Sequence, residues 1–246
     1  MSRIVFLGDL HGNMVATEAM AAQLDKIRPD QIWFLGDAVG KGPANIETCD
    51  WVRTHCDRFL QGNWDDWIYS CYVSRNDPTP DLFQAENSFF WKQIGEERLN
   101  WLHSLALEDE ILISGIHFRV FHGRPMDKLY QGYNSDDDLR PGFYGKLTDK
   151  KFDSYICADS HRPYVRSLHD GYAINTGSVG NSIGVPRAHA LLVEGDLDSE
   201  EITPISFTIL SVPYDNEKAA QAALSTEGLP MAEAFANEVR TGVYSR

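Results

Sequence analysis

The sequence predicts an α/β fold in a single domain, and three observations support this prediction. The N-terminal third alternates short apolar strand patterns with helical patterns, and such β-α-β runs build parallel sheets with crossover helices. From Ile111 onward, the pattern changes to short strands in hairpins. No linker, repeat or low-complexity run divides residues 1–246, a length that suits one α/β domain.

Apolar runs closed by glycine or proline predict the elements of the N-terminal third. The strand candidates are β-branched or aromatic, and they are residues 3–7, 32–35 and 58–61. The helix candidates carry apolar residues near helical spacing, and they are residues 14–26 and 44–54.

The remaining chain divides into an aromatic-rich segment, a run of strands and a helical end. Residues 65–107 are poor in strand patterns and are broken at residues 76–80, which predicts a helical insertion over the site. The strand candidates that follow are residues 111–113, 118–121, 155–157, 164–168, 172–175, 188–193 and 202–212. Residues 216–241 predict two final helices.

Composition excludes several classes of protein. The formal net charge of −14 argues against extended nucleic-acid binding, which requires clustered Lys and Arg, although bound cations would still admit a small anionic substrate. Four cysteines without a CxxC pair argue against a disulfide framework and favour a reducing compartment. The N-terminus lacks a signal-peptide pattern, and no apolar run approaches the roughly 20 residues of a membrane span. We therefore expect a soluble, cytoplasmic protein.

Residues that bind metal ions follow the ends of five predicted strands. In α/β sheets, active sites lie beyond the carboxyl ends of the strands, so these side chains should converge in one crevice. Their carboxylate, imidazole and amide groups suit Mn²⁺, Fe²⁺ or Mg²⁺. In chain order they are Asp9, His11, Asp37, Asn63, His122, Asp159 and His161.

Five motifs resemble, in order, those of the calcineurin-like metallophosphoesterases. They are Asp9-Leu-His11, Gly36-Asp-Ala-Val-Gly-Lys-Gly-Pro43, Gly62-Asn-Trp-Asp65, Phe121-His-Gly123 and Ala158-Asp-Ser-His161. The segment Ile174-Asn-Thr-Gly-Ser-Val-Gly180 also looks like one in the bacterial phosphodiesterase branch, which includes diadenosine tetraphosphate hydrolases. The resemblance covers roughly residues 3 to 193, a length over which ordered motifs are specific.

The resemblance implies a fold and a set of ligands. The fold would be a four-layer αββα sandwich of two mostly mixed sheets flanked by helices. Two divalent ions would lie roughly 3.5–4 Å apart, with Mn²⁺ or Fe²⁺ expected and Mg²⁺ or Zn²⁺ as alternatives. One ion would be held by Asp9, His11, Asp37 and His161, and the other by Asp37, Asn63, His122 and Asp159.

The resemblance also implies a mechanism. A hydroxide shared by the two metals would attack phosphorus in a phosphodiester or phosphoanhydride, such as a dinucleoside polyphosphate. Asp37, Asn63 and His122 are the expected catalytic residues. Arg124 and Arg162 lie beside motif residues and are candidates for binding substrate phosphate, with surface salt bridges as the alternative.

Two departures from the family pattern change what we expect. Trp64 stands where many members have a histidine that protonates the leaving group, and an indole N–H is no acid at neutral pH. We therefore expect better cleavage of phosphoanhydrides and aryl esters than of alkyl esters.

Asp159 replaces a histidine of the family pattern, and as a harder ligand it favours Mn²⁺, Fe²⁺ or Mg²⁺ over Zn²⁺. If Asp159 points away, the second metal would bind weakly.

Two other functions compete with a phosphodiesterase of small phosphorylated substrates. Trp64 and Asp159 leave open a degenerate site on a fold that serves as a binding scaffold, whereas the six retained family ligands argue for catalysis. A phosphoserine phosphatase fits less well, because the chain is short and carries the bacterial type of Gly-Ser-Val-Gly segment.

The sequence does not determine the oligomeric state, and a homo-oligomer is possible. Asp65 and Asp66 are predicted to cap a helix rather than to bind metal.

Overall fold

A computed structural model of the protein describes residues 1–77, 87–123, 152, 154–168 and 171–245. In its first sheet the strands β1–β3 are parallel, β9 pairs antiparallel with β1, and β10 pairs antiparallel with β9. In the order β10-β9-β1-β2-β3, the strands are Ser206–Val212, Ala188–Gly195, Ser2–Leu7, Gln31–Phe34 and Arg58–Phe59.

The second sheet also has five strands and is also mixed. β5, β6 and β8 run parallel at its centre, and β4 and β7 pair antiparallel at its edges. In the order β4-β5-β6-β8-β7, the strands are Glu108–Ile113, Ile116–Phe121, Ser154–Cys157, Gly171–Asn175 and Tyr164–Leu168. The predicted turn at residues 169–170 lies outside the described residues.

Strand β1 is buried on both faces and joins two cores. Ile4 and Phe6 pack between the sheets with side chains such as Phe118 of β5. Val5 and Leu7 face the other way, into a core shared with the helices. A strand buried on both sides needs this continuous apolar run. Truncating Phe6, which is fully buried, to alanine would cost about 3–5 kcal/mol.

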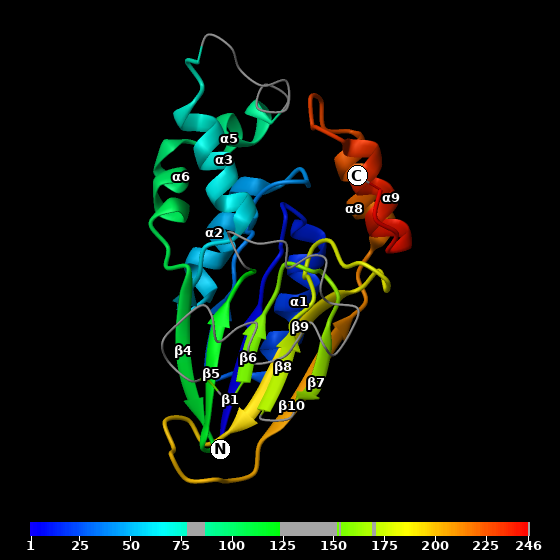
Figure 1. The fold of residues 1–246 in the computed structure, drawn as a ribbon. Helices are drawn as coiled ribbons and strands as arrows, with labels where there is room; N and C mark the ends of the chain where they lie inside the picture. The colour runs from blue at the N-terminus through cyan, green and yellow to red at the C-terminus, as the bar shows by residue number, and fades with distance from the viewer. Residues whose placement is uncertain (78–86, 124–151, 153, 169–170, 246) are drawn as a thin grey trace.

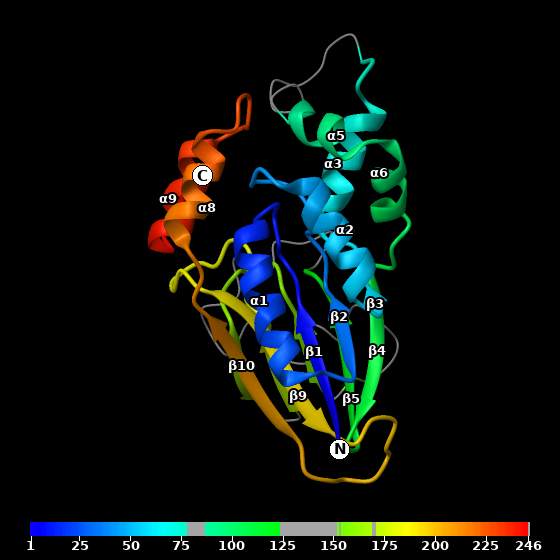
Figure 2. The ribbon, with the colours of Figure 1, turned by 180° about the vertical axis from the view of Figure 1, so that it is seen from behind.

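Helices cover the outer face of the first sheet and surround one end of both sheets. Figure 2 shows α1 (Met14–Ile27) and α2 (Asn45–His55) over β1 and β2. At the end to which the parallel strands point lie α3 (Asn63–Val73), α5 (Ser88–Ile94) and α6 (Glu96–His103) on one side. The hairpin of α8 (Asn216–Leu224) and α9 (Ala232–Thr241) lies on the other side (Figure 1).

The predicted α/β fold of two mixed sheets flanked by helices is confirmed. The expected helical insertion at residues 65–107 is present as α3, α5 and α6, apart from residues 78–86, which lie outside the described part. The helical layer expected over the outer face of the second sheet is not among the described residues. None of the described helices combines the length and the hydropathy that a membrane crossing requires.

Candidate metal centre

The seven predicted ligands converge at the carboxyl ends of the parallel strands. Each lies in the loop after a strand, except Asn63, which begins α3 after the short β3. Six of the seven are buried, and Asn63 is exposed at the edge of the group. The buried ones are Asp9, His11, Asp37, His122, Asp159 and His161.

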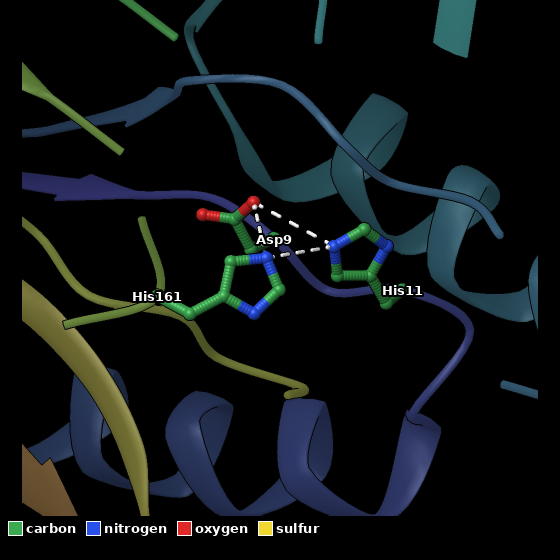
Figure 3. A group of neighbouring side chains, drawn as sticks. All are labelled: Asp9, His11 and His161. Carbon is green, nitrogen blue, oxygen red and sulfur yellow. Dashed lines mark hydrogen bonds and ion pairs between the residues drawn. The ribbon is translucent and has the colours of Figure 1, made fainter. Parts of the chain in front are cut away.

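One group of side chains centres on Asp9. Its Oδ1 lies 3.3 Å from His161 Nε2 and 3.6 Å from His11 Nε2, and the two Nε2 atoms lie 3.2 Å apart (Figure 3). The other carboxylate oxygen, Oδ2, accepts the backbone N–H of Asp159 at 3.1 Å. This bond turns Oδ1 toward the imidazoles.

A second group centres on His122. Its Nε2 lies 3.1 Å from Asn63 Oδ1, 3.4 Å from Asp159 Oδ1 and 3.5 Å from Asp37 Oδ2. Asp37 Oδ2 is also 3.5 Å from His11 Nε2. Asp37 therefore lies between the two groups, and Asp159 points into the site.

Backbone carbonyls fix the orientation of all three imidazoles. A carbonyl only accepts, so each Nδ1 carries a proton and directs Nε2 into the site. The donor–acceptor pairs are His11 Nδ1 to Val39 O at 3.2 Å, His122 Nδ1 to Leu35 O at 2.7 Å, and His161 Nδ1 to Asn181 O at 2.5 Å. Metal-binding histidines are held in this way.

This arrangement fits a cation better than it fits a closed hydrogen-bond network. With Nδ1 of each ring bonded to a carbonyl, His11 and His161 bring their two Nε2 atoms within 3.2 Å of each other. Asp9 Oδ1 is buried and makes no well-directed hydrogen bond to the described residues. A positive ion among these atoms would satisfy all of them. Two triplets have donor atoms close enough to share an ion: Asp9, His11 and His161, and Asp9, Asp37 and His122.

The buried groups shift one another's protonation. Burial raises the pKa of Asp9, but His161 and the other imidazoles outweigh it and hold the pKa well below its usual value. Burial and Lys41 lower the pKa of His11. Burial raises the pKa of Asp37. Burial lowers the pKa of His122, but carboxylates led by Asp37 outweigh it and raise the pKa well above its usual value. Such clusters mark functional sites.

The loops hold several side chains in a left-handed backbone conformation. L-residues adopt positive φ at a cost of order 1–3 kcal/mol, which persists where the surrounding structure imposes it. Here it aims the side chains of each loop at one point. The residues are Asp9 (φ 54°), His11 (48°), Asp37 (60°), Lys41 (60°), Asp159 (65°) and His161 (57°).

Asp65 connects the Asp37 loop to the start of α3, a role that its position in the sequence does not indicate. As predicted, it caps α3 rather than facing the metal-binding atoms, and it accepts the N–H of Gly62 at 3.0 Å. It also accepts the N–H groups of Asp37 at 2.9 Å and Ala38 at 3.1 Å. Burial and the nearby Asp37 raise the pKa of Asp65 to about 7.

Lys41 and Trp64 border the site. Lys41 is buried, with Nζ 3.4 Å from His161 Nε2 and 5.8 Å from the centre of the Trp64 ring. Trp64 lies edge-on to His11, with ring centres 5.9 Å apart. Of the two predicted substrate contacts, Arg162 is exposed beside the His161 loop, and Arg124 lies outside the described residues.

Comparison with known proteins agrees with the fold and with this set of residues. A profile of the calcineurin-like phosphoesterase superfamily domain matches residues 2–198. The chain therefore belongs to the calcineurin-like phosphoesterase superfamily, a class of metal-dependent hydrolases.

The chain is also similar to curated bacterial enzymes. It is 32% identical over 123 residues to a symmetrical bis(5'-nucleosyl)-tetraphosphatase of Yersinia enterocolitica, a match that covers 45% of this chain and 39% of that enzyme. The enzyme of the same name from Pectobacterium carotovorum is 30% identical over 45% of this chain and 41% of its own length. The matches thus span about two fifths of these relatives.

Two solved structures share the fold along almost the whole chain. A metallophosphoesterase from Sphaerobacter thermophilus aligns with a TM-score of 0.72 at 23% identity, over 98% of this chain and 99% of that one. A hypothetical protein from Pyrococcus horikoshii aligns with a TM-score of 0.76 at 17% identity, over 100% and 99% of the two chains. At these identities the likeness establishes the fold alone.

Proposed function

We propose that this chain is a phosphoesterase that uses two divalent metal ions to hydrolyse a phosphodiester or a phosphoanhydride. The observation that carries the proposal is the convergence of three imidazole Nε2 atoms and the carboxylates of Asp9 and Asp37 within one buried cluster. Asp9 Oδ1, at the centre of this cluster, has no hydrogen-bond partner among the described residues, and a divalent cation would satisfy it.

The proposed ligands divide between two ions that share Asp37. Asp9, His11 and His161 would hold one ion with Asp37, and Asn63, His122 and Asp159 would complete the other. Oxygen donors dominate the second set, which favours Mn²⁺ or Fe²⁺ over Zn²⁺. Two bound divalent ions supply an activated water and neutralise charge on the phosphoryl oxygens.

The chain's own residues have distinct tasks in this proposal. Asp37 holds one carboxylate oxygen equally far from His11 and His122, which suits a ligand shared by two ions. Asn63, exposed beside His122, adds a neutral oxygen at the side open to solvent. Lys41 brings a positive charge beside His161, where a phosphoryl oxygen would be attracted. Arg162 remains a second candidate for this contact.

The proposed substrate is a small anion whose leaving group departs without a proton, such as a dinucleoside polyphosphate. Trp64 supports this choice, because its indole borders the site at the position where many family members have a histidine that protonates the leaving group. The names of the bacterial relatives support the same class of substrate. We also propose that residues 1–246 form one domain that acts in the cytoplasm.

The competing scaffold function finds less support. A binding surface gains nothing from a buried group of carboxylates and histidines in strained backbone conformations, and both the burial and the strain reduce stability. Backbone strain of this kind is typical of functional sites, where the surrounding structure maintains it.

Hydrolysis by metal-free protein tests the proposal. Bis-p-nitrophenyl phosphate and diadenosine tetraphosphate would be incubated with the protein, with and without added Mn²⁺. We expect turnover only with the metal, and its loss in Asp37→Asn but not in Asp66→Asn, which changes an exposed carboxylate. Folded protein that is inactive with every divalent ion would overturn the proposal and favour the scaffold.

A further inference from the structure

A fully buried carboxylate on α9 is connected to the metal centre. Glu238 is 0% exposed, and its Oε2 accepts a hydrogen bond from Asn181 Nδ2 at 3.1 Å. Its Oε1 accepts the backbone N–H of Ser245 at 3.0 Å. Helix α9 lies beyond residues 2–198, to which the superfamily profile extends. The link therefore joins a C-terminal element outside the matched domain to the core of that domain.

Asn181 contacts the metal centre at two points. Its Oδ1 accepts from Lys41 Nζ at 3.1 Å, and its backbone carbonyl accepts from His161 Nδ1 at 2.5 Å. Its own N–H donates to Ser178 Oγ at 2.8 Å, and that hydroxyl donates to Asp9 O at 2.8 Å. Movement of Asn181 would therefore displace a candidate ligand and the lysine beside it.

The partners of Asn181 leave its amide one orientation. An ammonium only donates and a carboxylate only accepts, so Oδ1 must face Lys41 and Nδ2 must face Glu238. Asn181 is 1% exposed, so water does not replace either bond. The amide transmits the position of the α9 carboxylate to Lys41, and the backbone of the same residue sets the His161 ring.

We propose that Glu238 is a positioning residue, which acts through Asn181 to hold Lys41 and His161 at the metal centre. This inference rests on the proposed function, because it requires that the centre binds metal. Loss of a partner that orients a ligating histidine typically lowers the metal affinity by about 10–100-fold. Helix α9 is then part of the framework of the site.

Exchanging the donor and the acceptor of this bond tests the inference. Glu238→Gln leaves one acceptor oxygen, in place of two, for the donors of Asn181 and Ser245, and Asn181→Asp sets a carboxylate against Glu238 while it keeps an acceptor for Lys41. Asn181→Asp/Glu238→Gln restores one donor and one acceptor with the direction reversed. The matched control is Arg240→Gln, which removes the exposed Arg240–Glu217 pair between α9 and α8.

The readout is the Mn²⁺ dissociation constant of metal-free protein, measured by calorimetric titration alongside thermal unfolding. We expect about tenfold weaker binding in each single variant, recovery of most of the affinity in the double variant, and wild-type affinity in Arg240→Gln. The inference would be overturned if both single variants bound Mn²⁺ as tightly as the wild type does. A double variant no better than the single ones would also overturn it.

Folding failure does not leave the inference undecided. If a single variant fails to fold, the double variant decides, because it must then fold and bind Mn²⁺ nearly as tightly as the wild type. A double variant that does not do so overturns the inference. Wild-type protein that binds no divalent ion would instead overturn the proposed function, on which the inference depends. The two failures are therefore distinguishable.

Discussion

Asp37 Oδ1 accepts a hydrogen bond from the backbone N–H of Trp64 at 2.8 Å. This bond directs Oδ2 toward His11 and His122, each 3.5 Å away, and it needs only the backbone of Trp64. A tryptophan can thus replace the histidine of many family members without disturbing Asp37. The replacement changes the chemistry at the border of the site and leaves the candidate metal ligands in place.

The dependence of rate on the leaving group should reveal the effect of Trp64. Without an acid, the rate of hydrolysis of a series of aryl and alkyl diesters should fall steeply as the pKa of the leaving alcohol rises. Trp64→His should make this dependence shallower, because an imidazole can donate a proton. The control is Trp67→His, which changes the neighbouring ring 5.1 Å away. A flat dependence in the wild type would show that Trp64 does not limit the substrates.

Exchanging Asp159 should change which metal activates the enzyme. Asp159 Oδ1 lies 3.4 Å from His122 Nε2 and would be a hard oxygen ligand. Asp159→His should increase activation by Zn²⁺ relative to Mn²⁺, as measured by rates at saturating concentrations of each ion. An unchanged ratio, with Asp159→Ala also unchanged, would mean that this carboxylate does not bind the second ion.

Asp65 should contribute more to stability than its exposed neighbour. It accepts three backbone N–H groups, of Asp37, Ala38 and Gly62, and Asp65→Asn would leave at least one buried donor without an acceptor. We expect a loss of about 1–3 kcal/mol in the free energy of unfolding, measured with urea. Asp66→Asn should change it by less than about 0.5 kcal/mol. Equal losses in the two variants would argue against the bridging role of Asp65.

Residue patterns sufficed to predict the parts of the site that follow strand ends. Asp9, Asp37 and Asp159 each follow the end of a predicted apolar strand. They lie close together in the structure because parallel strands bring their carboxyl ends to one edge of a sheet. The helical insertion was predictable from the absence of strand patterns. The boundaries of short elements were predicted less accurately. Strand β3 ends at Phe59, whereas the predicted strand extends to residue 61, where the chain turns toward Asn63.

Contacts between side chains that are distant in sequence could not be predicted. The position of Asp65 after Gly62-Asn63 predicts a helix cap, but its second role toward the Asp37 loop depends on how the loops pack. The bond between Asn181 and Glu238 spans 57 residues and joins a loop to a helix that carries no motif. The burial of Lys41 beside His161 depends on its left-handed backbone, for which its sequence neighbours give no specific signal.

A buried histidine outside the site should make stability depend on pH. Burial lowers the pKa of His189 to about 4, from the ordinary 6.5 of an unfolded chain. Between these values the unfolded state binds a proton that the folded state does not, so stability should fall as the pH drops from 6.5 toward 4. The loss is roughly 3 kcal/mol from this residue.

Urea unfolding of the wild type and of His189→Gln over this pH range isolates that contribution. Ser182 and Ser211 flank the ring at 2.7 and 3.1 Å, and glutamine retains a group that can bond to a hydroxyl. The variant should lose less stability than the wild type on acidification. Parallel curves would contradict the assignment to His189.

We propose above that the buried cluster binds two metal ions that make the chain a phosphoesterase. The most direct test titrates metal-free protein with Mn²⁺ while following bound metal per chain and hydrolysis of bis-p-nitrophenyl phosphate. We predict that activity rises with bound metal and saturates at two ions per chain, and that Asp37→Asn abolishes it. Folded wild-type protein that binds no metal, or binds it without turnover of this or any other phosphate ester or anhydride, would contradict the claim.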